Sequence, residues 1–299
     1  MLSAKFNVWK RKSWRVELFL ELQAAIEMAE VAEASAGLAE ELAHVVDRRV
    51  EAGAAAPPEL VRAKADGAVL RAAADAARGE VESRALALAA LWGEAEVDFR
   101  LPDGTAVRLE GLQRNAASDP GMHPRLKAAR AGADARAAAT DRARAGAWPD
   151  LTVSAGIRRF EDTGDSAFLA GVSLPLPLFD RNDDATRAER FRTEGAELNT
   201  QAVSARLRAE QASLSARARA ATSRLQRLEG EALPLAEEAY SAAAKGYRVG
   251  KFDLTATLDA RRSLIETRAA VIDARLALQT ETLRLRALIG AAPFEGANQ

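Results

Sequence analysis

Residues 183–248 carry a long helical pattern that Gly195, Gly230 and Pro234 interrupt. One continuous helix of 66 residues, at a rise of about 1.5 Å per residue, would extend over on the order of 100 Å. Pro234 cannot donate a backbone hydrogen bond, so we expect a kink at that position. A helix this much longer than the diameter of a small domain predicts an elongated, mainly helical molecule.

A second long helix is predicted over residues 253–289, and its apolar residues form two neighbouring heptad seams. One seam contains Leu264, Val271, Leu278 and Leu285, and the other contains Leu258, Ile265 and Ile272. Two seams require more than one partner helix, so a bundle or a helical tube fits better than a dimeric coiled coil. Further helices are predicted over residues 17–51, 58–91 and 124–147. The aromatic content of only 5% suits helices that pack closely through alanine.

Residues 148–182 change to a period of two, which is typical of strands. Apolar and polar residues alternate in two arms, which a polar turn at 161–165 separates, and this pattern predicts a β-hairpin. Pro175 and Pro177 cannot donate to a ladder and should end the second arm. The predicted apolar face consists of Leu151, Val153, Ile157, Phe168, Val172 and Leu174. Tilted strands of about 9–11 residues span a bilayer, so this face is a candidate for lipid contact, although half-buried hairpins of soluble proteins show the same alternation.

Charge and motif content argue against several classes of function. The 42 basic and 43 acidic residues give a net charge of -1, which removes the electrostatic case for nucleic-acid binding. The chain has no cysteine and its two histidines, His44 and His123, are far apart in sequence, so we expect no metal site and no cofactor. No catalytic motif is present, so we expect no enzymatic activity. No secretion signal is visible after Met1 and no apolar run reaches the roughly 18–20 residues of a spanning helix, so any membrane crossing should use strands.

The early and late helical regions are related by an internal repeat. Gly53 and Gly93 are 40 residues apart, as are Gly250 and Gly290, which defines an offset of 197 residues. Twelve of the 41 aligned positions are identical, and they include leucines and arginines, which recur less easily by chance than alanine. Under this offset the counterpart of the β-hairpin would lie upstream of Met1. We therefore expect the first repeat to be truncated at its start.

Several short motifs follow one another in a specific order. They are His123-Pro124, Trp148-Pro149-Asp150, the run from Gly171 to Asn182, Tyr247-Arg248-Val249-Gly250 and Leu258-Asp259-Ala260-Arg261. Their order and spacing, over residues 17–290, resemble the TolC-like outer-membrane efflux channel family. The run from Leu174 to Asn182 is most similar to the outer-membrane subunit of cobalt-zinc-cadmium tripartite efflux systems.

The resemblance implies a mainly α fold, in which long antiparallel helical hairpins form a periplasmic tube and one β-hairpin contributes to a trimeric outer-membrane β-barrel. It implies a homotrimer that contacts outer-membrane lipid, a periplasmic adaptor protein and a resistance-nodulation-division inner-membrane pump. The expected location is the outer membrane and periplasm of a Gram-negative bacterium. The expected function is a passive conduit that exports substrates, with heavy-metal cations as the expected cargo.

The resemblance also assigns roles to the turn between the last two helices. Tyr247 and Asp259 match family positions at the periplasmic gate. The tip-loop residues expected to contact the adaptor are Arg248, Gly250, Lys251 and Gly53. Ala256 stands where the family pattern has a second acidic residue, and Asp253 is a candidate replacement. Structural alternatives stay open, since Tyr247 could be a helix-end residue, Gly250 a helix C-cap and Asp259 a solvated charge.

We expect five segments along the chain. They are the rear of the first repeat (1–93), a connecting segment with one helix (94–147), the membrane β-hairpin (148–182), the second-repeat helical hairpin (183–290) and a tail (291–299). The main alternative function is a soluble periplasmic adaptor or another structural interaction protein built on helical hairpins. Adaptors also carry β-rich domains, for which this sequence has too few predicted strands.

Overall fold

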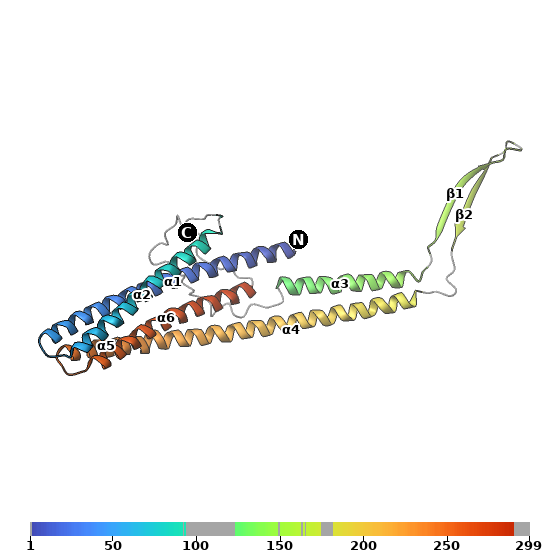
Figure 1. Cartoon of the computed structure of the whole chain (residues 1–299). Helices are drawn as coiled ribbons and strands as arrows, with labels where there is room; N and C mark the ends of the chain where they lie inside the picture. Colours follow the sequence, from blue (N-terminus) through green and yellow to red (C-terminus); the bar gives the residue numbers. More distant parts are fainter. Residues whose placement is uncertain are drawn as a thin grey trace, which may run out of the picture. The chain divides into compact units, whose positions relative to one another are not determined.

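The computed structural model describes residues 2–91, 93, 123–148, 150–162, 164, 166–174 and 182–289, with side chains from Arg15 onward. Its elements are α1 (Leu2–Glu51), α2 (Pro57–Ala89), α3 (Pro124–Ala145), β1 (Thr152–Arg159), β2 (Ser166–Ser173), α4 (Asp183–Arg227), the π-helical turn η3 (Leu228–Ala232), α5 (Leu233–Arg248) and α6 (Leu254–Ile289) (Figure 1). Most of the predicted connecting segment, both prolines after the hairpin and the predicted tail lie outside the described residues: 94–122, Pro175, Pro177 and 291–299. Among the described helices, none is long and apolar enough to cross a membrane.

The helices predicted from the sequence are present. α1 begins at Leu2, earlier than the predicted start at residue 17, because residues 2–16 contain neither proline nor glycine to end a helix. Pro57 opens α2 in the first turn, where its missing N–H is not needed. His123 caps α3, since its Nδ1 accepts the backbone N–H of Arg125 at 3.1 Å. The second histidine of the chain therefore has a structural role.

Where we expected a kink at Pro234, the chain forms the π-helical turn η3 directly before it. The backbone N–H of Leu233 donates to the carbonyl of Leu228, five residues earlier, instead of four. Proline lacks an N–H and its ring crowds the carbonyl four residues earlier, so a regular α-helical hydrogen bond cannot form at Pro234. The wider turn accommodates this residue and lets the chain continue as α5.

Two ion pairs join α1 to α2 in the first repeat. Arg71 lies 2.8 Å from the carboxylate of Glu40, and Arg78 lies 2.7 Å from that of Glu33. The side chains are about half-exposed, so water and salt screen both pairs and neither contributes much to stability. The two pairs nevertheless define the register of α1 against α2. Seven residues separate the two arginines, and seven separate the two glutamates.

The second repeat has two equivalent ion pairs, but its two glutamates are one residue further apart in the sequence. Arg268 and Arg275, the equivalents of the two α2 arginines, pair with Glu237 of α5 at 2.8 Å and with Glu229 of η3 at 2.6 Å. Seven residues separate these arginines, but eight separate these glutamates. The π-turn between the glutamates accommodates the additional residue. The structure thus confirms the internal repeat, with an offset of 197 after η3 and 196 before it.

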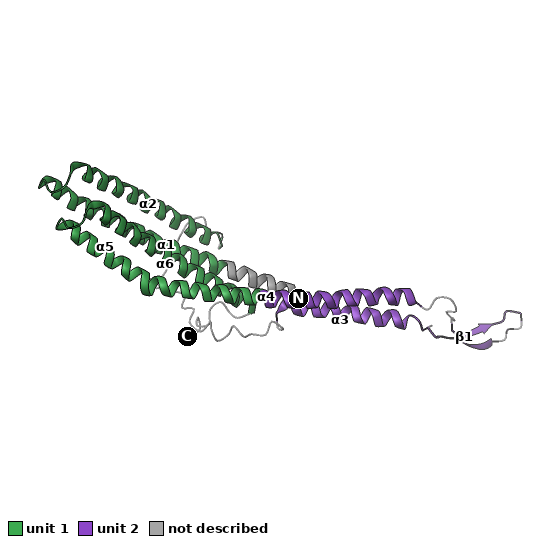
Figure 2. Cartoon of the chain, turned by 90° about the horizontal axis from the view of Figure 1, so that it is seen from below, with its two compact units in different colours: residues 1, 3–118, 210–299 green, residues 2, 119–209 purple. Residues whose placement is uncertain are grey.

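The chain divides into two compact units, drawn in green and purple in Figure 2. The first unit contains α1, α2, the C-terminal part of α4, η3, α5 and α6, which come from residues 1, 3–118 and 210–299. Its helical hairpins α1–α2 and α5–α6 contribute jointly to one apolar cluster, which consists of Leu42, Val46, Ala63, Tyr247, Leu254 and Leu258. The second unit contains α3, the β-hairpin and the N-terminal part of α4, which come from residues 2 and 119–209.

In the second unit, β1 and β2 form an antiparallel pair with eight residues in each strand. The register places Val153 opposite Val172 and Ile157 opposite Phe168, so the predicted apolar residues lie on one side of the hairpin. All six residues of the predicted apolar face are exposed: Leu151, Val153, Ile157, Phe168, Val172 and Leu174. Phe168 is 89% exposed, and a contiguous apolar face of this kind usually marks a surface that another apolar phase or protein covers.

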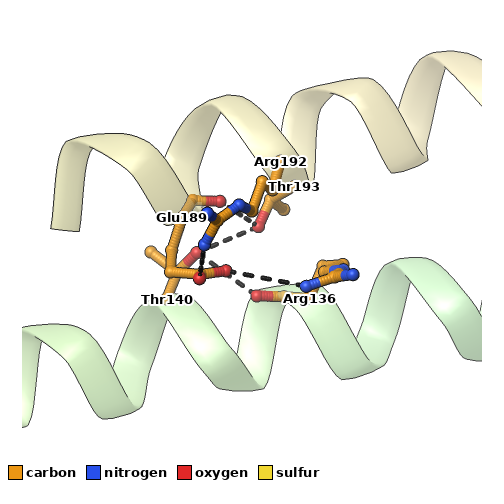
Figure 3. Close-up of polar contacts among 5 residues, drawn as sticks. All are labelled: Arg136, Thr140, Glu189, Arg192 and Thr193. Carbon is orange, nitrogen blue, oxygen red and sulfur yellow. Dashed lines mark hydrogen bonds and ion pairs between the residues drawn. The ribbon is translucent and has the colours of Figure 1, made fainter. Parts of the chain in front are cut away.

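Polar side chains join α3 to the first part of α4 (Figure 3). The hydroxyl groups of Thr140 on α3 and Thr193 on α4 share a hydrogen bond of 2.9 Å. Glu189 pairs with Arg192 on its own helix, and its other carboxylate oxygen lies 4.0 Å from Nη1 of Arg136 on α3. Thr140 is buried and Glu189 is largely buried, so this network sets the register between the two helices that flank the β-hairpin.

Candidate functional site at the helical tips

The first helical hairpin reverses direction through a Schellman motif. The backbone N–H of Gly53 donates to the carbonyl of Val50 at 2.9 Å, and the N–H of Ala54 donates to the carbonyl of Arg49 at 2.7 Å. Gly53 has a φ of 67°, a left-handed conformation that glycine adopts without the strain of a side chain. These bonds satisfy carbonyl groups that the end of α1 would otherwise leave free.

The second helical hairpin uses the same motif at the equivalent residues. The N–H of Gly250 donates to the carbonyl of Tyr247 at 3.1 Å, and the N–H of Lys251 donates to the carbonyl of Gly246 at 2.8 Å. Gly250 has a φ of 75°. Gly250 therefore ends α5 one residue after the C-cap Val249, and its place in the exposed tip is compatible with this structural role.

Tyr247 lies in the apolar core that joins the two tips. Its side chain is only 1% exposed and belongs to the same cluster as Val46 of α1, Ala63 of α2 and Leu258 of α6. Its hydroxyl group donates a hydrogen bond of 3.0 Å to Oε2 of Glu59 at the start of α2. Within one copy of the chain, Tyr247 therefore connects the second-repeat tip to the first.

Arg49, at the end of α1, makes the complementary connection. Its guanidinium lies over the ring of Tyr247, 4.4 Å from the ring centroid, which is a cation–π geometry. Nη1 donates to the carbonyl of Tyr247, and Nη2 donates to the carbonyl of Ala54 at 3.0 Å. One arginine thus binds carbonyl groups from both tip turns. We call Arg49, Glu59 and Tyr247 the tip cluster.

The tip cluster has a predictable pH dependence. Burial of Tyr247, together with its hydrogen bond to Glu59 and the negative charge of that carboxylate, raises the pKa of the phenol from 10.0 to about 12. A folded-state pKa above the unfolded value means that this stabilisation is complete below about pH 10 and is lost as the pH rises through about 12.

We therefore expect the free energy of unfolding to fall more steeply for the wild type than for Tyr247→Phe between about pH 10 and 12, by roughly 1.4 kcal/mol per pH unit. Urea unfolding followed by circular dichroism at several pH values measures both slopes. The phenylalanine variant is the matched control, because it keeps the ring and every other titrating group. Equal slopes in the two proteins would contradict the assignment.

The residues predicted for adaptor contact lie at the exposed ends of the tips. Arg248, Gly250 and Lys251 are exposed at the second tip, and Gly53 is exposed at the first. Phe252, in the same loop as Lys251, is 52% exposed. The basic side chains and the aromatic ring of this loop are therefore accessible to a partner. Contact between the loop and an adaptor stays a prediction.

The two predicted gate residues, Tyr247 and Asp259, lie in different surroundings. Asp259 lies on the exposed side of α6 and makes no hydrogen bond or ion pair with another residue in the part of the chain that the structure describes, whereas Tyr247 is buried. Asp253, the candidate replacement for a second acid at Ala256, caps α6 instead, since its Oδ1 accepts the backbone N–H of Ala256 at 2.8 Å. Asp253 therefore has a structural role.

One ion pair at the tips has a buried guanidinium and a partly exposed carboxylate. Arg261 of α6 is only 2% exposed and pairs through Nη2 with the carboxylate of Asp66 on α2. Burial lowers the pKa of Arg261, and its Nε has no hydrogen-bond partner. This pair connects the second helix of one repeat to the second helix of the other. Over the described ranges, no group of three or more His, Asp or Glu residues could hold a metal ion.

Arg49, Glu59 and Asp66 were missed by the sequence analysis, although each of them holds the second repeat to the first. An alignment of the two repeats could have identified two of these residues, Arg49 and Glu59. It aligns Arg49 with Gly246 and Glu59 with Ala256, so the first repeat carries charge at tip positions where the second has only small residues. At these two positions, the difference between the aligned repeats marks a residue that contacts the other repeat.

Both the sequence and the fold match known proteins. The model of the family described as outer membrane efflux protein matches residues 121–291. The cobalt-zinc-cadmium resistance protein CzcC of Cupriavidus metallidurans is 31% identical over 261 residues, which cover 85% of this chain and 61% of that protein. The nickel-cobalt-cadmium resistance protein NccC of Alcaligenes xylosoxydans xylosoxydans is 31% identical over 219 residues, which cover 69% of this chain and 48% of that protein. This chain thus spans about half to three-fifths of the length of these two relatives.

The fold has a counterpart in the outer membrane protein VceC from Vibrio cholerae. The TM-score is 0.71 at 22% sequence identity, and the superposition covers 98% of this chain and 72% of VceC. This likeness confirms the predicted fold class of helical hairpins with a β-hairpin. The family model extends over more than half of the residues. This chain belongs to the outer membrane efflux protein family.

Proposed function

We propose that the protein is the outer-membrane channel of a tripartite efflux pump and acts as a passive conduit. The observation that carries this proposal is the β-hairpin between α3 and α4, whose apolar residues share one exposed face. In a closed barrel, neighbouring hairpins satisfy every backbone edge and turn their apolar faces to lipid. Membership of the efflux protein family favours this channel over the soluble adaptor alternative.

We extend the proposal to divalent transition-metal cations as cargo. The support comes from the relatives at 31% identity, which are named for resistance to cobalt, zinc and cadmium and to nickel, cobalt and cadmium. A conduit does not need a high-affinity site for its cargo, because tight binding would slow release.

The proposed assembly is a homotrimer in the outer membrane of a Gram-negative bacterium, working with a periplasmic adaptor and a resistance-nodulation-division pump. The test is the mass of the protein extracted from membranes in detergent. We expect three chains in each particle. A monodisperse monomer that is soluble without detergent would contradict the proposal.

We also propose that the tips form the periplasmic entrance, where three copies of Asp259 would lie in a ring. At about 5 Å and the dielectric constant of water, each carboxylate would attract a monovalent cation by on the order of 1 kcal/mol. We expect Asp259→Asn to lower the cation-to-anion permeability ratio roughly threefold or more and to weaken block by divalent cations.

Reversal potentials in a salt gradient measure this ratio for reconstituted protein. Glu266→Gln is the matched control, because Glu266 is also an exposed acid of α6 but already pairs with Arg262 at 2.9 Å. Unchanged selectivity in Asp259→Asn, or an equal loss in both variants, would remove Asp259 from the entrance.

A further inference from the structure

The apolar face of the β-hairpin ends in a polar row. Residues directly opposite each other in the ladder point to the same side of the hairpin. Three apolar pairs follow one another along this side: Val153 with Val172, Ala155 with Ala170, and Ile157 with Phe168. The next pair on the same side, at the turn end of both strands, is Arg159 with Ser166, which we call the end row. Both residues are exposed, and the guanidinium of Arg159 makes no hydrogen bond or ion pair with any residue that the structure describes.

The end row lies at the end of the hairpin that is remote from the helices. β1 follows α3 and β2 leads back to α4, so the turn after Arg159 is the far end of the hairpin. In the proposed channel the helices are periplasmic, and the far end of the hairpin therefore reaches the outer side of the membrane.

The length of the strand places Arg159 at the level of the lipid headgroups. Leu151 and Arg159 are eight residues apart, which is about 27 Å along a strand and about 20 Å of depth at a tilt of about 40°. The apolar band of a membrane barrel is about 25 Å tall and is flanked by aromatic residues. Trp148, which is 80% exposed just before β1, suits the inner edge of this band, so Arg159 lies at the outer edge.

The chemistry of the end row suits a phosphate group. The outer leaflet of a Gram-negative outer membrane consists largely of a glycolipid whose lipid A part carries phosphate groups at headgroup level. A guanidinium binds phosphate through two parallel N–H donors, which makes this pair more specific than that of a point charge. The apolar stem of Arg159 can stay beside Ile157 and Phe168 while its charge reaches the headgroups. Ser166 adds a hydroxyl donor on the same side.

We propose that the end row is a binding site for the phosphate groups of outer-leaflet lipid A. The site rests on the proposed channel and adds which lipid the hairpin holds and through which side chains. The adjacent Arg158 provides an internal comparison, because it lies opposite Ala167 on the other face of the hairpin. That face turns toward the water-filled lumen in the proposed barrel, so Arg158 meets no lipid phosphate.

The test compares two neutral variants of the trimer purified in detergent. Arg159→Gln and Arg158→Gln remove the same charge from adjacent positions of one strand. We expect Arg159→Gln to bind lipid A that carries both phosphates about fivefold more weakly than the wild type does. Arg158→Gln should bind it as the wild type does, and Arg159→Lys, which keeps the charge, should retain most of the affinity. Native mass spectrometry with added lipid A measures these affinities and shows in the same spectrum that each variant is still trimeric.

Two further probes identify the source of the phosphate. Lipid A without its phosphates should bind equally to the wild type and to Arg159→Gln, because only the acyl chains and sugars remain to be held. Inorganic phosphate at the same concentration should not displace phosphorylated lipid A, because the acyl chains also hold the lipid on the apolar face. Displacement would show a site for a free anion and would overturn the proposed lipid site.

The failure of the lipid site differs from the failure of the channel. A trimer in which both glutamine variants lose affinity equally, or in which neither loses it, would overturn the lipid site and leave the channel intact. A protein that is monomeric and soluble without detergent would overturn both.

Discussion

Replacing Ile157 with arginine should prevent the protein from assembling in the outer membrane. Ile157 lies on the apolar face of the hairpin, opposite Phe168, and is 68% exposed in the single chain. An arginine on the lipid side of a membrane strand costs up to about 2–4 kcal/mol, so three copies in a trimer lose up to about 6–12 kcal/mol. That loss is comparable to the whole folding free energy of a domain, about 5–15 kcal/mol. We expect the heat-sensitive trimer band in outer-membrane fractions to fall roughly tenfold or more.

Ser154→Arg is the matched control for this variant. Ser154 lies on the opposite face of β1, paired with Gly171, and Arg158 already occupies the same face. Lumen-facing positions of a barrel tolerate charge, so this variant should assemble close to the wild-type level. If the two arginine variants assembled equally well, the six apolar residues would not face lipid.

Replacing Asp66, whose side chain is 35% exposed, with alanine should destabilise the helical tips by up to about 3–5 kcal/mol, because it leaves the buried guanidinium of Arg261 without a counter-charge. Arg261 is 2% exposed and its Nε already lacks a hydrogen-bond partner, so the pair with Asp66 is the main compensation for burying this charge. Urea unfolding followed by circular dichroism measures the loss. We expect a clear shift of the transition to lower urea concentration.

Two further variants define the origin of that effect. Arg261→Met in the Asp66→Ala background removes the unpaired charge and should recover most of the lost stability. Glu40→Ala breaks an ion pair of the same kind with Arg71, but both partners are about half-exposed, so it should cost less than about 1 kcal/mol. A small loss in Asp66→Ala, similar to that of Glu40→Ala, would show that water reaches Arg261.

Periodicity predicted most of the fold, because helices and strands with one apolar face have patterns that need no tertiary information. The period of two placed six apolar residues of the hairpin on one face, and the register of β1 and β2 confirms this for Val153, Ile157, Phe168 and Val172. Periodicity could not predict the π-turn at 228–232. That turn results from two separate constraints, the missing donor of Pro234 and the pairing of Glu229 with Arg275, and the second one is visible only once the helices are packed.

The tip site was predictable only in part, for the same reason. The resemblance pointed to Tyr247, but its contacts with Arg49 and Glu59 join residues that are far apart in the sequence. No local pattern reports such a contact. The pair of Asp66 with the buried Arg261 is a further case, since an arginine in a helix is far more often exposed than buried.

The most direct test of the channel proposal is a planar-bilayer recording on the detergent-purified protein. A trimeric efflux channel should add discrete, stable conductance steps, with a preference for cations that depends on Asp259. A water-soluble monomer that adds no conductance at any concentration would contradict the account.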